Sequence, residues 1–135
     1  MRWGAMAAVA LLFVHFSACQ GQERDSAERA ADDTASSLKL PAGVPARVRT
    51  VLLFIDQHGR APSGYEGGRP FHNYGSHGDE ALPHRDARGR NIRYREWDVN
   101  RKIPGRNRGA QRLVTGSDGS AYYTSDHYRS FIKIR

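Results

Sequence analysis

The chain has 135 residues, which is enough for one domain with a modest hydrophobic core. Its 21 Lys and Arg residues exceed its 14 Asp and Glu residues, so the formal net charge is +7. This excess predicts a polyanionic partner, such as nucleic acid, an anionic membrane surface or an acidic protein, unless it serves only solubility. A single cysteine, Cys19, excludes an internal disulfide bond.

The N-terminal segment, residues 1–19, resembles an export signal. It has a cationic start at Arg2, an apolar run too short to span a bilayer, and small residues before Cys19. The last four residues, Phe16 to Cys19, resemble a bacterial lipoprotein signal, in which the cysteine is lipidated. We expect a secreted or periplasmic protein, either free or anchored to a membrane through Cys19.

Residues 20–40 are polar, acidic and rich in Ala and Ser, which predicts a flexible linker. The positive charge therefore belongs to residues 41–135, the predicted folded domain. Apolar residues at helical spacing open this domain, with Pro45 suited to the first turn and Gly59 to the position after the last. The stripe that predicts this helix consists of Val44, Val48, Val51, Leu52 and Ile55.

After the predicted helix, the spacing of apolar residues changes from the helical period to the alternation typical of strands. Residues 60–91 read as a long irregular loop with a short strand near Arg69–Asn73, and such long loops are uncommon in compact domains unless they are functional. Alternating segments follow at residues 92–100, 110–115, 120–125 and 128–134. The pattern predicts an α+β fold, with one N-terminal helix packed on a small antiparallel β-sheet.

Alternation along the first of these segments separates two faces. It places Glu96 on the face opposite to Trp97 and Val99, which are expected in the core. Glu96 should therefore project from an open face of the sheet. A single glutamate in such a position is usually only surface decoration.

Basic residues follow around a glycine-containing turn, at Arg106, Arg108 and Arg112. Two guanidinium groups that converge would hold a phosphate, although a solvated basic hairpin would have the same pattern. Near the end of the chain, His127 offers a proton donor. A carboxylate base, a histidine acid and paired arginines together suffice to cleave RNA without a metal.

These residues lie within recognisable motifs. The stretches REWDVN, RNRGAQR and YYTSDHYRSFIKIR resemble the guanyl-preferring microbial ribonucleases of the barnase type. Upstream, LPAGVPARVRTVLLFIDQHG is more similar to the short one-helix actinobacterial members, and the resemblance covers residues 38–135. It implies the microbial ribonuclease fold and an endoribonuclease of single-stranded RNA. Such enzymes cleave 3′ of guanosine, without a cofactor, to a 2′,3′-cyclic phosphate that they then hydrolyse.

The resemblance also implies roles for single residues. Glu96 matches the general base of the family, and His127 matches its general acid, which we expect on a strand that lines an open cleft. Arg108 and Arg112 match the arginines that bind phosphate, and Tyr128 matches the tyrosine beside the substrate.

The loop that would read guanine departs from the family pattern. Members usually have Phe-x-Asn-Arg-Glu followed closely by Leu-Pro, whereas this chain has FHNYGSHGDEALP, with Tyr74 in place of the arginine and an insertion. Either Asp79 or Glu80 is then the expected carboxylate for the base. The residues expected to bind substrate in this loop are Phe71, His72, Asn73, Tyr74, Asp79 and Glu80.

Two other functions fit parts of the sequence. A metal-dependent nuclease would use the loop histidines His72, His77 and His84 with Asp79, although their spacing matches no regular metal site. A non-catalytic RNA-binding module would need only charge and exposed aromatic rings, but it would gain nothing from Glu96 among arginines. We therefore expect no metal, a monomer that acts on RNA, and an acidic inhibitor of the barstar type, which the resemblance implies.

Overall fold

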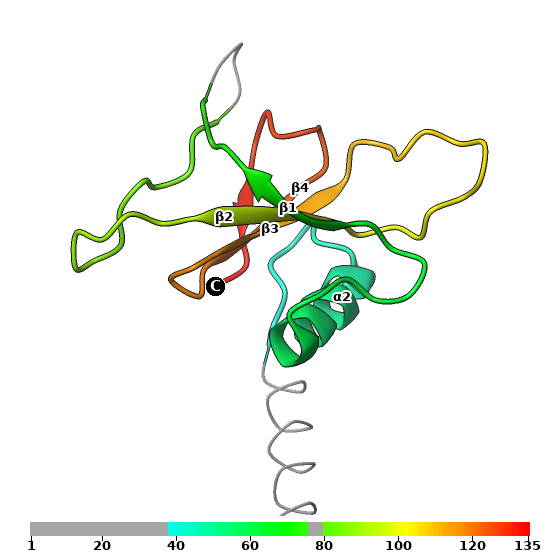
Figure 1. Ribbon diagram of the computed structural model, residues 1–135, viewed down its shortest axis with the longest axis horizontal. Coiled ribbons are helices and arrows are strands. Elements are labelled where there is room, and N and C mark those ends of the chain that lie inside the picture. The colour runs from blue at the N-terminus through cyan, green and yellow to red at the C-terminus, as the bar shows by residue number, and fades with distance from the viewer. Residues whose placement is uncertain (1–37, 76–79) are drawn as a thin grey trace, which may run out of the picture. The chain divides into compact units, whose positions relative to one another are not determined.

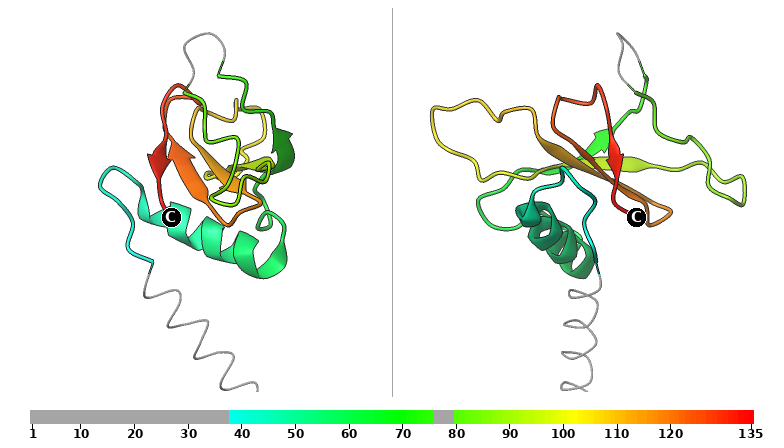
Figure 2. Two further views of the ribbon diagram at one scale, coloured as in Figure 1. Left: turned by 90° about the vertical axis from the view of Figure 1, so that its left-hand side faces the viewer. Right: turned by 180° about the vertical axis from the view of Figure 1, so that it is seen from behind.

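A computed structural model describes residues 38–75 and 80–135, which belong to one compact unit. One helix lies against one face of an antiparallel sheet, and the views of Figures 1 and 2 agree in this arrangement. The predicted α+β fold is confirmed. No helix in these two ranges is long and apolar enough to cross a membrane. The elements are α2 (Ala46–His58), β1 (Gly67–Phe71), β2 (Tyr94–Asp98), β3 (Arg112–Gly116), β4 (Ala121–Thr124) and β5 (Ile132–Lys133).

The helix has the end and the buried face that the sequence predicts, but it begins at Ala46, so Val44 lies before it and is only partly buried. Pro45 is the N-cap residue, with an extended backbone, and Gly59 is the C-cap residue, with a left-handed φ of 65°. The N–H of Gly59 donates to the carbonyl oxygen of Ile55 at 2.7 Å, which satisfies one of the free carbonyl groups of the last turn. The buried side chains of α2 are those of Val48, Val51, Leu52 and Ile55.

The five strands form a meander in the order β1-β2-β3-β4-β5, with antiparallel pairing throughout. The register places Glu96 on the central part of the sheet, opposite Arg69 of β1 and Val114 of β3. A β-bulge between Gly67 and Arg69 sets this register on the β1 side. Side chains of β1 and β3 therefore flank the glutamate.

One expected strand is mostly a loop. The alternating segment 128–134 contributes only the two residues of β5, and His127 lies in the β4–β5 loop rather than on a strand. Both His127 and Tyr128 have a positive φ, at 61° and 75°. The prediction was wrong because side-chain hydrogen bonds to the backbone, described below, compete with strand pairing in this segment.

Each face of the sheet carries its own hydrophobic cluster. Trp97 and Val99 pack against α2, as the alternation predicts, and Leu38 and Leu40 pack against the same core. Tyr94 lies on the opposite face, the face of Glu96, in a smaller cluster. This face is thus partly covered rather than open, and the predicted domain boundaries at residues 19 and 40 remain predictions. The smaller cluster contains Leu82, Tyr94, Val114 and Tyr122, with Phe71, Ile92, Tyr128 and Phe131 against it.

The bulge of β1 gives a first prediction. Gly67 has a φ of 150°, and a Cβ atom there would lie 2.6 Å from the Cα atom of Trp97. Gly67→Ala should lower the free energy of unfolding by about 3 kcal/mol, because strained backbone and overpacking add. Gly119→Ala is the control, since its φ is 88° but no atom lies within 4 Å of the added Cβ. Urea denaturation should show a clearly smaller loss for Gly119→Ala, and equal losses would contradict the close approach.

Candidate active site

The carboxylate of Glu96 is held at both oxygens. Arg69 binds Oε1 through two nitrogens, with Nε at 3.1 Å and Nη2 at 2.9 Å. The hydroxyl of Tyr128 donates a hydrogen bond to Oε2. The side chain of Glu96 is 15% exposed, so it reaches solvent, but its orientation is fixed from two sides. A carboxylate fixed in this way and still accessible is suited to accept a proton from a bound ligand.

The hydroxyl of Tyr128 remains a proton donor in this arrangement. Burial, together with the hydrogen bond to Glu96 and its charge, raises the pKa of Tyr128 well above that of a free tyrosine. Arg112 opposes this rise. The ring packs on Phe71, with 5.0 Å between ring centroids, which connects β1 to the β4–β5 loop.

Asp98 joins the two arginines that were expected to bind phosphate. Its carboxylate is 4% exposed and receives hydrogen bonds from Nε of Arg108 at 3.1 and 2.8 Å. Nε of Arg112 lies 3.3 Å from Oδ1 of the same carboxylate. Burial raises the pKa of Asp98, and the charge of Arg112 opposes that rise. Nη2 of Arg108 also binds Asp98, and its Nε lies 3.5 Å from Oε2 of Glu66. Within the described part of the chain, Nη1 of Arg108 has no partner and can therefore meet an anion.

Arg112 is the more deeply buried of the two. Its side chain is 4% exposed, against 25% for Arg108. Nη1 of Arg112 donates to the carbonyl oxygens of Gly109 and Gln111, at 2.9 and 2.8 Å. These bonds place the guanidinium group beneath the turn that leads into β3.

Asp126 shapes the loop that carries His127. Its Oδ1 accepts from the hydroxyl of Thr124 at 2.8 Å and from the N–H of Ser130 at 3.0 Å, and its Oδ2 accepts from the hydroxyl of Ser130 at 2.6 Å. The N–H of His127 donates to the carbonyl oxygen of Ala110 at 3.2 Å. The left-handed backbone of His127 is thus held by its neighbours on both sides.

This arrangement predicts a pH-dependent stability. Hydrogen bonds from the hydroxyl and N–H of Ser130, with that from Thr124, lower the pKa of Asp126 from 3.8 to about 2. The ionised carboxylate therefore stabilises the fold fully above pH 3.8, and this contribution is lost as the pH falls toward 2. Asp126→Asn should lower the melting temperature at pH 6 and have progressively less effect as the pH falls from about 4 to about 2. A difference that stays constant over this range would contradict the assignment.

His127 and the arginines line one hollow. An open depression of about 530 Å³, here called the His127 hollow, is lined by Arg108, Arg112 and His127 together with Arg106. The imidazole is exposed, and its ring lies beside that of Tyr128 with 4.8 Å between centroids. Since Tyr128 also contacts Glu96, the tyrosine connects the carboxylate to the histidine. The structure thus brings Glu96, His127, Arg108, Arg112 and Tyr128 together.

The loop after β1 closes a second, smaller hollow. The side chain of Asn73 donates to the carbonyl oxygen of Leu82 at 2.8 Å and accepts from its N–H at 2.7 Å. This reciprocal pair ties the two ends of the loop together, so the Asn73 side chain is committed to structure. The hollow, here called the base pocket, has a volume of about 280 Å³. It is lined by Arg69, Pro70, Phe71, His72, Asn73, Tyr74, Gly75, Glu80 and Glu96.

The remaining predicted loop residues differ in their surroundings. Oε2 of Glu80 accepts from the N–H of Phe131 at 2.8 Å, which connects the loop to the segment after His127. His72 and Tyr74 stack on each other, with an interplanar angle of 6°, and the Tyr74 ring is 80% exposed. Asp79 lies outside the described residues.

A comparison with protein families gives a match that covers all of the described residues. A family model described as ribonuclease matches residues 24–135. The chain belongs to this ribonuclease family. Membership confirms the resemblance to the barnase-type microbial ribonucleases and establishes the chain as an endoribonuclease. Among solved structures, ribonuclease Sa2 with guanosine-2′-cyclophosphate is similar, at 31% identity over 69% of this chain and 88% of that chain, with a TM-score of 0.47. A comparison with curated proteins finds no match.

Three residues of this ribonuclease were missed by the sequence reasoning as members of the site. Arg69 is predicted only as part of a short strand, and no motif in the sequence assigns a role to Asp98 or Asp126. The pairing of β1 with β2 and the position of the arginine turn, which the sequence does not reveal, bring the first two into contact with Glu96 and Arg108.

The metal-dependent alternative relies on four loop residues, of which only His72 and His84 lie in the described part of the chain. Over the ranges 38–75 and 80–135, no three His, Cys, Asp or Glu side chains are placed to bind one metal ion. His77 and Asp79, on which this alternative relies, lie outside the described residues.

Proposed function

We propose that this endoribonuclease cleaves single-stranded RNA 3′ of guanosine, by metal-independent transesterification to a 2′,3′-cyclic phosphate followed by hydrolysis. The observation that carries the proposal is the carboxylate of Glu96, held by Arg69 and Tyr128 in the same site as His127. A phosphate binder has no use for a fixed carboxylate among cations, whereas acid–base catalysis requires one.

In the first step, Glu96 accepts the proton of the guanosine 2′-hydroxyl as O2′ attacks the adjacent phosphorus. The bond from phosphorus to O5′ of the next nucleotide breaks, and His127 donates a proton to that leaving oxygen. Arg108 and Arg112 stabilise the negative charge that develops on the phosphoryl oxygens. Both arginines are fixed by Asp98 before substrate arrives, so little reorganisation is needed.

In the second step, water replaces the leaving nucleotide and the two roles reverse. His127, now neutral, accepts a proton from water, and Glu96 returns its proton to O2′ as the cyclic ester opens. Arg69 and Tyr128 act through Glu96 as positioning residues, because each contacts one of its oxygens. The product is a guanosine 3′-phosphate end.

Support for guanine preference comes from the base pocket beside Glu96. It is lined by Phe71 and by Glu80, whose carboxylate can accept from the N–H donors of a guanine. The Asn73 side chain and Leu82 tie the two ends of the loop together beside this pocket. Tyr74 replaces the family arginine at the rim and offers its exposed ring for stacking on the base.

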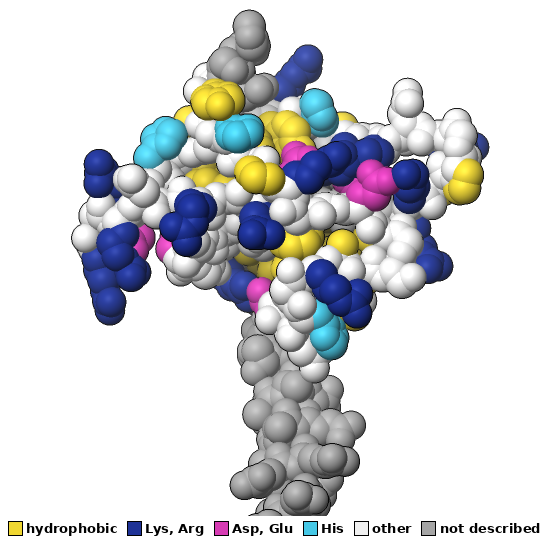
Figure 3. All heavy atoms as spheres, in the orientation of Figure 1, with side chains coloured by type: hydrophobic (Ala, Val, Ile, Leu, Met, Phe, Trp, Pro, Cys, Tyr) yellow, Lys and Arg dark blue, Asp and Glu magenta, His cyan; other side chains and the backbone are white. Residues whose placement is uncertain are grey.

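The proposal also includes export of the protein from the cytoplasm and its inhibition by an acidic partner protein. Residues 1–19 would direct the protein out of the cytoplasm, with Cys19 as the lipid-bearing residue if the lipoprotein signal is used. In Figure 3, Lys and Arg side chains spread over the face in view, with few acidic ones among them. A monomer with such a surface would bind an acidic inhibitor of the barstar type through complementary charge.

The test is a comparison of four dinucleotides, GpU, ApU, CpU and UpU, incubated with the purified protein in EDTA and analysed by chromatography. Rapid cleavage of GpU with much slower cleavage of the others would agree with the proposal. Equal cleavage of all four would retain the reaction and reject guanine preference. Binding without any cleavage would leave an RNA-binding module, and cleavage only after addition of a divalent cation would leave a metal-dependent nuclease.

A further inference from the structure

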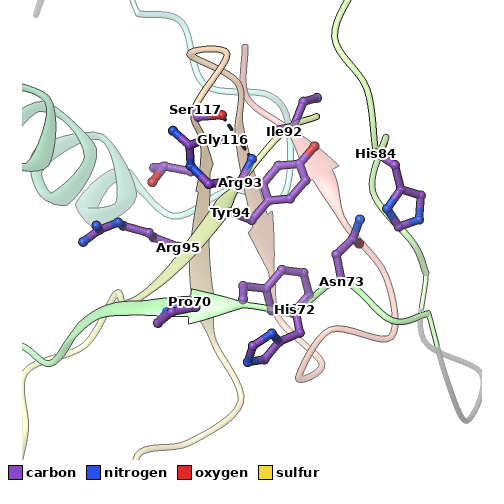
Figure 4. A pocket seen from close by; sticks show the side chains of 12 residues that line it. Pro70, His72, Asn73, His84, Ile92, Arg93, Tyr94, Arg95, Gly116 and Ser117 are labelled. Carbon is purple, nitrogen blue, oxygen red and sulfur yellow. Dashed lines mark hydrogen bonds between the residues drawn. The ribbon is translucent and has the colours of Figure 1, made fainter. Parts of the chain in front are cut away.

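A third hollow lies next to the base pocket, on the other side of the segment 70–73. It has a volume of about 490 Å³, which is enough for a nucleotide, and it is here called the upstream hollow. Figure 4 shows Arg93 and Arg95 pointing to one side of the strand that carries them and Tyr94 and Ile92 pointing to the other side, with Pro70 and His72 on the neighbouring segment. None of the functions proposed above uses it.

The chemistry of the upstream hollow favours an anion. Arg93 and Arg95 are both exposed, and its lining contains no Asp or Glu. Neither guanidinium group forms an ion pair with a carboxylate in the described part of the chain. Arg95 donates only to the carbonyl oxygen of Gly68, at 3.2 Å, and the backbone N–H of Arg93 donates to the hydroxyl of Ser117 at 3.1 Å. Two exposed guanidinium groups without a carboxylate partner are suited to bind a phosphate.

The apolar part of the lining adds a surface for a base or sugar. Ile92 is partly buried, and Pro70 and Tyr94 lie beside it. The imidazoles of His72 and His84 border the same space. Apolar side chains and cations that border the same hollow are the combination that single-stranded nucleic acid requires.

The position of the upstream hollow relative to the reaction sets the direction of the RNA. The upstream hollow and the base pocket share the four residues of the segment 70–73. Neither shares a lining residue with the His127 hollow, and Glu96 borders the base pocket alone. In the proposed reaction the leaving nucleotide, on the 3′ side, lies at His127. The nucleotide on the 5′ side of the guanosine must therefore continue from the base pocket in the opposite direction, toward the upstream hollow.

We infer that the upstream hollow binds the nucleotide on the 5′ side of the cleaved guanosine. Arg93 and Arg95 contact its phosphate, and the surface formed by Pro70, Ile92 and Tyr94 carries its base or sugar. This inference rests on the proposed function, because that function gives the direction of the chain. The consequence is that longer RNA is a better substrate than a dinucleotide, and that the advantage comes from nucleotides added at the 5′ end.

The test compares kcat/KM for GpU and for UpUpGpU in three proteins. In the wild-type protein the added 5′ nucleotides should raise kcat/KM by about tenfold, which corresponds to roughly one charge-assisted phosphate contact. Arg93→Ala/Arg95→Ala should lose this gain and cleave GpU as before. The matched control is Lys39→Ala/Arg88→Ala, which removes two exposed cations outside the hollow and should keep the gain. A gain that survives in Arg93→Ala/Arg95→Ala, or that the control loses equally, would overturn the inference.

A binding measurement separates this inference from the proposed function. The probe is the same tetranucleotide with 2′-deoxyguanosine, which cannot be cleaved by attack of O2′, and anisotropy reports its affinity. Arg93→Ala/Arg95→Ala should bind it about tenfold more weakly than the Lys39→Ala/Arg88→Ala control, with a less steep dependence on salt. If the wild-type protein fails to cleave GpU, the proposed function is rejected. The difference in affinity between the two double variants still tests whether the upstream hollow binds RNA. Equal affinities of the two variants would overturn the inference whatever the activity.

Discussion

Glu96→Gln is expected to lower kcat/KM for GpU by about 10²- to 10⁴-fold, the range typical for loss of a general base. The amide cannot accept the proton of the 2′-hydroxyl, yet it has nearly the shape of the carboxylate. It also keeps one oxygen that can accept from Arg69 or Tyr128, so the fold should persist. The measurement is the steady-state rate of GpU cleavage in EDTA, with the melting temperature as a check on folding.

Asp56→Asn is the matched control for that experiment. Asp56 lies on α2 and pairs with Arg135 at 2.7 Å, outside the three hollows described above. Its substitution removes the same charge and should leave the cleavage rate of GpU unchanged. If Glu96→Gln were to retain more than a tenth of the wild-type rate, the carboxylate would not be the base, and the reaction would need another proton acceptor.

Asp98→Ala is expected to lower the free energy of unfolding by about 3 kcal/mol, because it leaves buried cationic charge without its partner. The Arg112 side chain is 4% exposed, and its Nε forms no hydrogen bond but lies 3.3 Å from Oδ1 of Asp98. Arg108 would lose both hydrogen bonds from Nε that fix its guanidinium group. The measurement is urea denaturation monitored by tryptophan fluorescence.

The comparison variant for stability is Asp56→Ala. It breaks an ion pair at the surface, where both side chains are about a third exposed, and such pairs contribute about 1 kcal/mol or less. Asp98→Ala should therefore shift the urea midpoint several times further than Asp56→Ala. Similar shifts for the two variants would mean that Asp98 does not neutralise the arginines in the folded protein.

The helix and the face assignment of β2 could be predicted from the sequence because both depend on local periodicity. The stripe from Val48 to Ile55 can only be buried by a helix, and the alternation of Glu96 with Trp97 separates two faces whatever their neighbours. The fold class follows from these local patterns in chain order. The assignment as a ribonuclease follows from the resemblance of the motifs, and family membership confirms that assignment.

The parts that could not be predicted depend on contacts between distant segments. The pairing of Arg69 with Glu96 requires the register of β1, which a bulge near Gly68 determines. Asp98 looks like a surface residue until the turn with Arg108 folds over it. The segment around His127 alternates like a strand, but Asp126 and its hydrogen bonds select a loop with left-handed residues instead.

The most direct test of the proposed reaction follows GpU by phosphorus NMR during incubation with the purified protein in EDTA. The account predicts that guanosine 2′,3′-cyclic phosphate appears first and accumulates, and that guanosine 3′-phosphate then replaces it. A linear phosphate that forms from the outset, or a reaction that starts only when a divalent cation is returned, would contradict catalysis by Glu96 and His127.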